Sequence, residues 1–405
     1  MSSTLALDIA QLQRKYQSTL LDNVIPFWMW HGRDLKHGGL FTAINQDGSI
    51  IDNDKSVWFQ GRGAWMFARL YNTVERNPEW LDVAQSAIAF LRNHCQSPSG
   101  KLYFTVTQEG KPLRMRRYVY SEAFAAIANA AYARAADDVE ATRDAARYFQ
   151  NYLHHSFRSD LIPSKTDSLT RPSQGIGPWM ICINTAQEIR ANLGDIEVLG
   201  HSCTEWIDEA IQRIGSHFYK PEFQVLLETA GPHGEILDHF EGRQLNPGHA
   251  IECAWFILHE AKLRSNLHYQ SLGLSILDGM WKRGWDEEYG GLYYFRDLRD
   301  LPVQEYWHDM KFWWPHCEAI IATLLAYQLT GQEKYAQWHQ KVHDWSFQHF
   351  SDPEFGEWFG YLHRDGRASV RLKGNMWKGP FHLPRMLWYC ASLLRPAVSL
   401  EQQPQ

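Results

Sequence analysis

The feature that most constrains the fold of this chain is an internal repeat of roughly 65 residues. A short pattern of glycine, a few extended residues and a turn recurs, anchored at Gly39, Gly100, Gly234, Gly291 and Gly356. These glycines are 61, 134, 57 and 65 residues apart, and the long step equals about two ordinary ones. We therefore expect a degenerate unit at residues 160–174, and six units that account for nearly the whole chain.

Two sets of helical segments alternate along these units. Each extended run precedes a segment whose apolar residues recur at i, i+3, i+4 and i+7, which is the period of a helix. This first set covers residues 58–72, 118–136, 179–192, 249–263, 314–330 and 381–394. A second, more charged set covers residues 7–29, 79–94, 140–157, 196–218, 266–283 and 333–350. The first set predicts helices buried on most faces, and the second predicts amphipathic helices with one wet face.

Twelve helices in alternating inner and outer sets predict an all-α protein, an (α/α)6 barrel of six helical hairpins. The short β-runs are expected in the loops at one end, where the inner helices begin and where a pocket belongs. We predict one catalytic domain over residues 1–397 and a polar C-terminal tail at 398–405. The alternative is an open α-solenoid that binds a partner protein on its concave face.

Composition narrows the range of ligands. The chain holds 18 Trp, 18 Tyr and 20 Phe, and aromatic residues make up 14% of it. Core packing explains much of this content, and the remainder fits a pocket that stacks sugars or bases. The net charge is −6, so the chain lacks the broad basic field that nucleic acids attract, and we expect no nucleic-acid partner.

Cysteine spacing and hydropathy bear on the compartment. The six cysteines are scattered without a CxxC motif, so we expect free core thiols and a reducing compartment. The N-terminal segment carries charge early, which is not typical of a signal peptide. No run of 18 apolar residues occurs, so no membrane contact is expected and the predicted location is cytoplasmic.

Polar side chains gather where the predicted inner helices begin. Buried polar groups need partners, so this concentration predicts a mutual network around a central cavity. The candidates are Arg62, Arg117, Tyr118, Glu122, Asn184, Glu188, His249, Glu252, Trp313, Trp314, His316, Glu318, Lys378, His382 and Arg385.

Several familiar motifs are missing. The chain has no HExxH, no Cys/His spacing of the zinc type, no GxxxxGK[ST] phosphate loop and no GxSxG elbow. His249 and Glu252 share one helix face at an i,i+3 spacing, which alone is a weak metal signal. We therefore predict chemistry without a metal.

Two of the histidines differ from the rest by position. His249 and His382 each follow a Pro-Gly or Gly-Pro turn that opens an inner helix, in the fourth and sixth units. They would approach one cavity from different walls, and each has a charged residue three positions on, Glu252 and Arg385. Most other histidines fall in outer helices or loops, where a solvent or hydrogen-bonding role is typical.

Two imidazoles that face each other across a sugar suit epimerisation next to a carbonyl. One base with a pKa near working pH removes the proton, and the other returns a proton to the opposite face. The developing enolate oxygen needs a preorganised positive partner, for which Arg62 is available. Glu252 and Glu318 are candidates to orient an imidazole and stabilise its protonated form.

Four motifs in this chain resemble the N-acylglucosamine 2-epimerase family. They are WFQGRGAWMFARLYN, NPGHAIECAWFILH, FWWPHCEA and KGNMWKGPFHLPRML. The resemblance implies an (α/α)6 barrel and the interconversion of N-acetyl-D-glucosamine and N-acetyl-D-mannosamine at C2. It also implies no cofactor in the chemical step, ATP as an allosteric activator that is not a phosphate donor, and a homodimer.

The resemblance also carries residues over by motif. His249 and His382 match the acid/base histidines of the family, Arg62 matches the arginine of its QGR segment, and Glu318 matches its WPHCEA carboxylate. For the substrate we expect a binding set, with the acetyl group against the two tryptophans. That set is Tyr118, Asn184, Glu252, Trp313, Trp314 and Arg385.

One position departs from part of the family. Aldose–ketose isomerases and cellobiose 2-epimerase carry an Asn followed one turn later by a third histidine. Here Asn184 is followed by Glu188, which favours the N-acyl sugar branch. A mannose-type aldose–ketose isomerase, a cellobiose-type 2-epimerase and a helical-repeat binding protein remain the alternatives.

Overall fold

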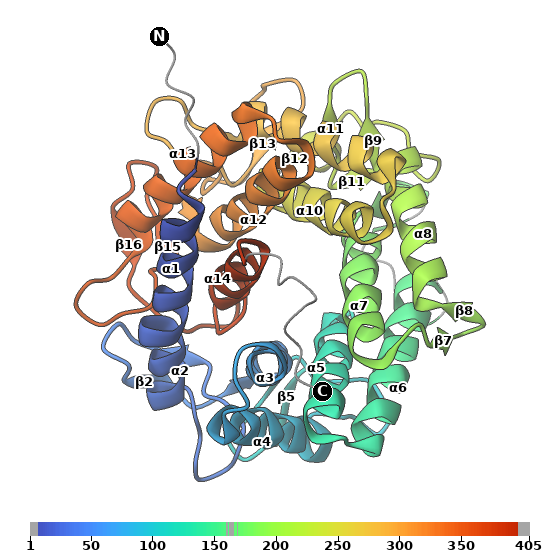
Figure 1. Cartoon of the computed structure of the whole chain (residues 1–405). Coiled ribbons are helices and arrows are strands. Elements are labelled where there is room, and N and C mark those ends of the chain that lie inside the picture. Colours follow the sequence, from blue (N-terminus) through green and yellow to red (C-terminus); the bar gives the residue numbers. More distant parts are fainter. Residues whose placement is uncertain (1–6, 159–160, 162–165, 168, 396–405) are drawn as a thin grey trace, which may run out of the picture.

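The computed structural model describes residues 7–158, 161, 166–167 and 169–395, and its helices form two concentric rings (Figure 1). The inner ring consists of α3 (Val57–Thr73), α5 (Tyr120–Ala136), α7 (Gly177–Leu193), α10 (Pro247–Arg264), α12 (Trp313–Thr330) and α14 (His382–Leu393). The outer ring consists of α1 (Ile9–Thr19), α4 (Pro78–His94), α6 (Val139–Phe157), α8 (Cys203–Arg213), α11 (Leu267–Gly284) and α13 (Glu333–Phe350). The π-helical segment η1 (Leu20–Val24) joins α1 to α2 (Ile25–His31), and η2 (Ile214–Phe218) extends α8.

The inner ring is closed. Each inner helix contacts the next one along the chain, and α14 returns to contact α3. This closure confirms the (α/α)6 barrel and excludes the open solenoid, whose first and last helices do not meet. Five of the six helix pairs are consecutive hairpins, whereas the sixth pairs α14 with α1, from opposite ends of the chain.

The two rings differ in burial as the sequence predicts. In α12, 14 of 18 residues are buried, whereas α13, its outer partner, buries one side and exposes the other. Small residues let the inner helices approach closely: a Cβ on Gly61 would lie 2.8 Å from the carbonyl carbon of Phe124 in α5. The ring is therefore held by burial of nearly continuous apolar faces.

One predicted helix was wrong in its extent, and several predicted helix starts differ from the structure by about two residues. The segment 196–218 is not one helix, because it opens with a hairpin of β7 (Glu197–Val198) and β8 (His201–Ser202). The helix starts only after Ser202, which forms a capping box with Glu205, so local hydrogen bonds set the start that periodicity placed too early. The inner helix predicted from residue 118 begins at Tyr120. Much of the degenerate unit predicted at 160–174 lies outside the described residues.

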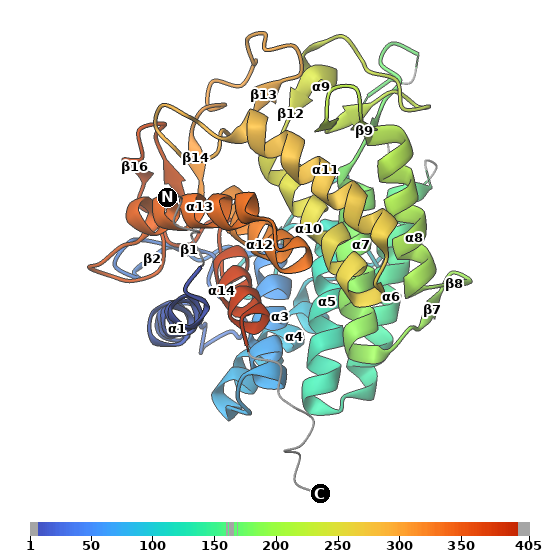
Figure 2. The same cartoon turned by 45° about the horizontal axis from the view of Figure 1, so that its top comes forward.

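Short strands fill the loops before the inner helices (Figure 2). The strands that join different loops pair as β3 (Lys55–Ser56) with β4 (Thr105–Val106), β6 (Gln174–Gly175) with β11 (Thr229–Ala230), β12 (Gln244–Leu245) with β13 (Arg296–Asp297), and β14 (Lys311–Phe312) with β15 (Tyr361–Leu362). The others are β1 (Ala43–Ile44), β2 (Ile50–Asp52), β5 (Pro112–Arg114), β9 (Tyr219–Lys220), β10 (Val225–Leu226) and β16 (Ala368–Val370). These pairs join neighbouring loops into a rim at one end, as predicted. Among the strands of the described residues, only the β7–β8 hairpin follows an inner helix. The rim also contains the short helix α9 (Phe240–Arg243).

Buried ion pairs hold three of these loops. They are Lys55–Asp34, Lys311–Asp286 and Lys373–Asp352, with N···O distances of 2.7, 2.9 and 2.8 Å. The second carboxylate oxygen of each aspartate accepts backbone N–H groups of the turn that follows, as Asp286 does from Glu288 and Tyr289. The sequence signal for these pairs is an Asp four residues before a glycine, which the spacing of the glycines alone does not reveal.

Other predictions have mixed outcomes. All six cysteines are free and buried, as expected. Within the described part of the chain, no helix has the length and apolarity needed to cross a membrane. The predicted tail at 398–405 lies outside the described residues, so the domain boundary at residue 397 stays a prediction.

Candidate active site

A cavity of about 720 Å³ opens at the rim, where the inner helices begin. It brings together nine of the ten residues predicted for catalysis and substrate binding. Its lining includes Arg62, Tyr118, Asn184, His249, Glu252, Trp313, Trp314, His382 and Arg385. Glu318, the tenth residue, lies behind His382 and is fully buried.

His382 is the first residue of α14, and its imidazole is fixed from behind. Its Nδ1 donates to the Glu318 carboxylate at 2.7 Å, which leaves Nε2 for the cavity. The other oxygen of Glu318 accepts the indole N–H of Trp255 at 2.7 Å. Glu318 thus holds the imidazole of His382 by a hydrogen bond, and its part in catalysis stays a prediction.

Arg385 lies one turn further along α14 and links two carboxylates. Its Nη2 contacts Glu252 at 2.6 Å and Glu318 at 2.7 Å. Glu252, Glu318 and His382 place ligand-type atoms within 4.8 Å of one another, as a metal site would. The guanidinium of Arg385 already supplies the positive charge that these carboxylates need, so the cluster is accounted for as an ion-pair network.

His249, in the first turn of α10, has a partner that we did not predict. Its Nδ1 lies 3.0 Å from the carboxylate of Glu228, in the loop between β10 and β11. Glu252, the expected partner from the i,i+3 spacing, hydrogen-bonds Arg385 instead. Helical spacing places Glu252 on the same face of α10 as His249. Its carboxylate nevertheless pairs with the guanidinium of Arg385, which is always charged and forms the stronger hydrogen bond.

The two histidines flank one tryptophan. The ring of Trp314 lies 4.9 Å from that of His249 and 5.8 Å from that of His382, measured between centroids. Trp313 meets His382 edge to face at 6.0 Å. The imidazoles therefore approach one part of the cavity from two helices, with an aromatic surface between them.

The protonation tendencies of the two histidines are opposite. Burial disfavours the charge on His249, but the Glu228 carboxylate outweighs burial and raises the pKa of His249. Burial lowers the pKa of His382, and the nearby charges of Arg385 and Arg62 lower it further. Burial also raises the pKa of Glu318, against the opposing effect of Arg385.

Arg62 extends from α3 into an aromatic cage. Its guanidinium carbon lies 4.2 Å from the ring centroid of Phe124 and 4.9 Å from that of Phe381. One N–H donates to the backbone carbonyl of Trp377 at 3.1 Å. Burial lowers the pKa of Arg62 to about 9, so the guanidinium carries a poorly solvated positive charge at the cavity.

Most of the remaining cavity wall is aromatic. Sequence reasoning expected stacking side chains and named only Tyr118, Trp313 and Trp314 among them. The wall also includes Trp58, Tyr120, Phe124, Tyr294, Trp307, Phe312, Tyr361, Trp377 and Phe381. Trp58 stands one turn before Arg62 on α3, so its helical position is a signal that could have found it.

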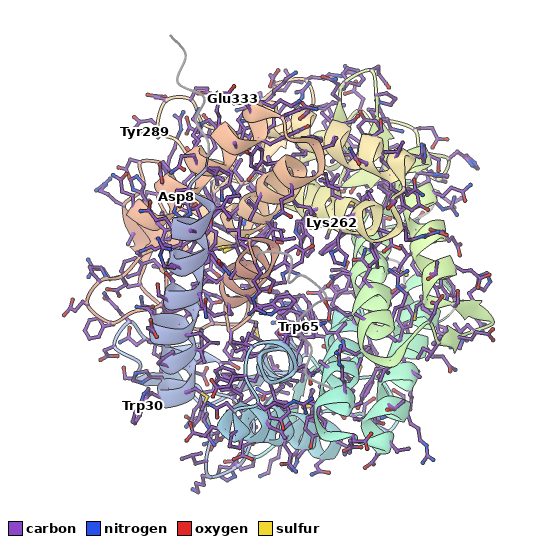
Figure 3. The ribbon with its side chains drawn as sticks, viewed as in Figure 1. Asp8, Trp30, Trp65, Lys262, Tyr289 and Glu333 are labelled. Atoms are coloured by element: carbon purple, nitrogen blue, oxygen red, sulfur yellow. The ribbon has the colours of Figure 1, made fainter. Side chains whose placement is uncertain are left out.

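Four other polar candidates have structural roles away from the cavity. Glu188 on α7 pairs with Arg69 and accepts from the indole N–H of Trp65, both on α3. Trp65 is labelled toward the middle of the ring in Figure 3. The other three hold loops: His316 accepts from the N–H of Leu292, Lys378 pairs with Glu357, and Glu122 accepts from the N–H of Leu102. The fifth, Arg117, is exposed in the loop before α5.

Solved structures with the same fold include a sugar epimerase and a sugar isomerase. The cellobiose 2-epimerase of Bacillus thermoamylovorans aligns with a TM-score of 0.81 at 20% identity, over 95% of this chain and 99% of that one. A D-mannose isomerase aligns with a TM-score of 0.78 at 20% identity, over 94% of this chain and 97% of its own. These similarities show the fold.

Sequence relatives are closer. The N-acylglucosamine 2-epimerase of Rattus norvegicus is 36% identical over 391 residues, which cover 92% of this chain and 90% of the relative. The enzyme of the same name from Homo sapiens is 34% identical and covers 94% of this chain and 89% of the relative. The cellobiose 2-epimerase of Bacteroides fragilis is 24% identical over 404 residues.

The closed barrel, its paired histidines and these relatives define a carbohydrate epimerase of the isomerase class. The sequence pattern of the family described as N-acylglucosamine 2-epimerase (GlcNAc 2-epimerase) matches residues 39–382. The chain belongs to this family.

Proposed function

We propose that this protein interconverts N-acetyl-D-glucosamine and N-acetyl-D-mannosamine by removing and returning a proton at C2. The observation that carries the proposal is the pair His249 and His382 on two helices. Each imidazole has its Nδ1 on a carboxylate, and both line one cavity and lie close to Trp314. Two bases on opposite sides of one carbon are what inversion of that carbon requires.

The chain's own residues supply each step. The open-chain sugar binds with its aldehyde oxygen toward Arg62, and one histidine takes the C2 proton through Nε2. The electron pair moves into the carbonyl, and the positive charge of Arg62 stabilises the enolate oxygen. The other histidine then returns a proton to the opposite face of C2 while the carbonyl re-forms, so one proton is taken and one is returned.

The surrounding side chains bind and position the sugar. Arg385 and Glu252 form a fixed polar edge, and Asn184 and Tyr118 reach the same cavity. Trp313 and Trp314 provide the aromatic surface against which we place the acetyl group. Among the described residues Arg62 donates to a backbone carbonyl and forms no ion pair with a carboxylate, so a polar ligand in the cavity would complete its hydrogen bonds, which favours an enzyme over a partner-binding scaffold.

The test is epimerisation in deuterium oxide followed by NMR. Starting from N-acetylglucosamine, the mannosamine product should carry deuterium at C2 from the first turnover, because the proton removed is not the proton returned. Product that keeps its original hydrogen at C2 would overturn the two-base reaction. Deuterium at C1 of a ketose product would indicate an aldose–ketose isomerase. Conversion of cellobiose, without conversion of the N-acetyl sugars, would indicate a cellobiose-type 2-epimerase.

The family resemblance also suggests how the enzyme is activated, how it assembles and where it is located. We propose that ATP activates the enzyme without being consumed, that the protein acts as a homodimer, and that it resides in the cytoplasm. A non-hydrolysable ATP analogue should then replace ATP in the assay, and the mass in solution should be twice that of one chain. Release of ADP in step with turnover would contradict the first of these.

A further inference from the structure

A two-base reaction needs one imidazole protonated and the other neutral before the substrate binds. Two histidines in equal surroundings would share this proton evenly. The surroundings of His249 and His382 are not equal, although each has a carboxylate at Nδ1. The difference lies in what else each carboxylate binds.

Glu228 is free to charge His249. Among the ion pairs of the described residues, Glu228 has His249 as its cationic partner and no lysine or arginine. Glu252 on the same helix and Glu318 on α12 add negative potential at His249. The side chain of His249 is 37% exposed, so water also reaches the imidazolium.

Glu318 is not free to charge His382. Its Oε1 is shared between His382 and Arg385, and its Oε2 is occupied by the indole N–H of Trp255. Positive potential from Arg385, Arg62 and His249 acts on His382, and Glu252 provides the opposing charge. The side chain of His382 is 10% exposed, so little water stabilises a proton on it.

We propose that Glu228 is a positioning residue that charges His249, so that His249 is the resting acid of the pair and His382 the resting base. This inference rests on the proposed two-base function. The opposite pKa shifts of the two imidazoles support it. In the resting form, His382 Nε2 accepts the C2 proton and His249 Nε2–H delivers one to the other face.

When His382 removes the C2 proton and His249 delivers one, the protonation states of the two imidazoles are reversed at the end of the turnover. The proton then sits on His382 and is absent from His249, so the pair must exchange protons with water before it repeats the reaction. The more exposed His249 is the natural point of reprotonation, with Glu228 retaining the incoming proton.

The direct test is an NMR titration of labelled histidine in the free protein, which does not depend on activity. In the wild type, His249 should titrate above His382. In Glu228→Gln, which keeps a hydrogen-bonding side chain and removes the charge, His249 should titrate about one pH unit lower. Glu222→Gln, an exposed carboxylate near the β9–β10 turn, serves as the matched control and should change neither imidazole.

The pH profile of kcat/KM gives the second readout. The alkaline limb reports loss of the acid, so in Glu228→Gln it should move about one unit toward acid while the acidic limb stays. At pH 8.5 this variant should then be about tenfold less active relative to its own optimum than the wild type. Glu228→Asp keeps the charge and should restore the alkaline limb.

Two outcomes would overturn the inference. A wild-type titration with His382 above His249 would reverse the assignment whether or not the variants fold. A uniform loss of activity in Glu228→Gln with both limbs unmoved would make Glu228 merely structural. Neither result would contradict epimerisation itself, which the deuterium experiment tests separately.

Discussion

At the scale of single residues, the cavity combines charged side chains with aromatic walls that limit their hydration. Arg62 is an example: its guanidinium is buried against Phe124 and Phe381, and this burial lowers its pKa to about 9. A charge held this way has few water molecules to reorganise when an enolate forms, which is the condition for strong electrostatic stabilisation.

Arg62→Met should lower kcat by about 10²–10³-fold, because it removes the charge that faces the enolate. Arg62→Lys should not behave as a conservative change. A lysine starts from a lower pKa than an arginine, and the same burial would lower it further, so it would lose charge at a lower pH than Arg62 does. Its activity relative to the wild type should therefore rise as pH falls from 8 to 6. Equal activity of the lysine variant and the wild type at pH 8 would contradict this account.

His249→Asn and His382→Asn should each lower turnover by about 10²–10⁴-fold while the fold survives, since each removes a positioned acid or base. The variants should also differ in exchange. Each should still wash out the C2 proton of the epimer that faces its remaining histidine, and NMR in deuterium oxide should show opposite preferences. Near-full activity in either variant would remove that histidine from the mechanism.

At the scale of elements, the loops that build the rim are fixed by buried ion pairs. Asp286 is fully buried, pairs with Lys311 at 2.9 Å and also binds Arg364 at 2.8 Å. Burial alone would raise the pKa of Asp286, but these two cations outweigh it and hold the pKa well below its ordinary value. The ion pair between Asp286 and Lys311 therefore connects the two ends of the loop that leads into α12, whose first residues are Trp313 and Trp314.

Asp286→Asn should cost about 3–5 kcal/mol of unfolding free energy, because it leaves Lys311 charged and buried. The neighbouring Glu287→Gln breaks only an exposed pair with Lys341 and should cost about 1 kcal/mol or less. Because the pKa of Asp286 is lower in the folded state, its contribution is complete above about pH 4 and fades as pH falls below that value. Urea unfolding at several pH values should show a flatter acid dependence in Asp286→Asn, and equal losses in the two variants would contradict the prediction.

At the scale of the whole molecule, the ring depends on the meeting of the two chain ends. Helix α1 packs on α14, and the hydroxyl of the fully buried Tyr16 lies 2.9 Å from both His339 Nε2 and His343 Nδ1 on α13. His339 donates through Nδ1 to the carbonyl of Ile320, so its Nε2 accepts from Tyr16. Burial lowers the pKa of His339 to about 3 and of His343 to about 4, which keeps both imidazoles neutral.

Tyr16→Phe should lower the unfolding free energy by about 1–3 kcal/mol, because two buried imidazole nitrogens lose their partner. Turnover of the folded enzyme should stay unchanged, since Tyr16 does not line the cavity. Urea unfolding with a parallel activity assay checks both expectations. An unchanged midpoint would mean that this contact does not help to close the ring.

The sequence by itself determined the alternation of helices, the division into six units and the positions of His249 and His382 at the starts of inner helices. These are local properties: helical period, turn residues and repeat spacing are all read along the chain. Glu318 was found because its motif lies in a helix that the repeat had already placed.

Only the tertiary structure decided which charges meet. Glu228 lies 21 residues before His249 in a loop without periodicity, so no spacing rule connects them. Glu252 has the right helical spacing for His249 yet pairs with Arg385, 133 residues away, because the barrel brings α14 across from α10. Electrostatic pairing depends on distance in space, and once the ring closes that distance is independent of position along the chain.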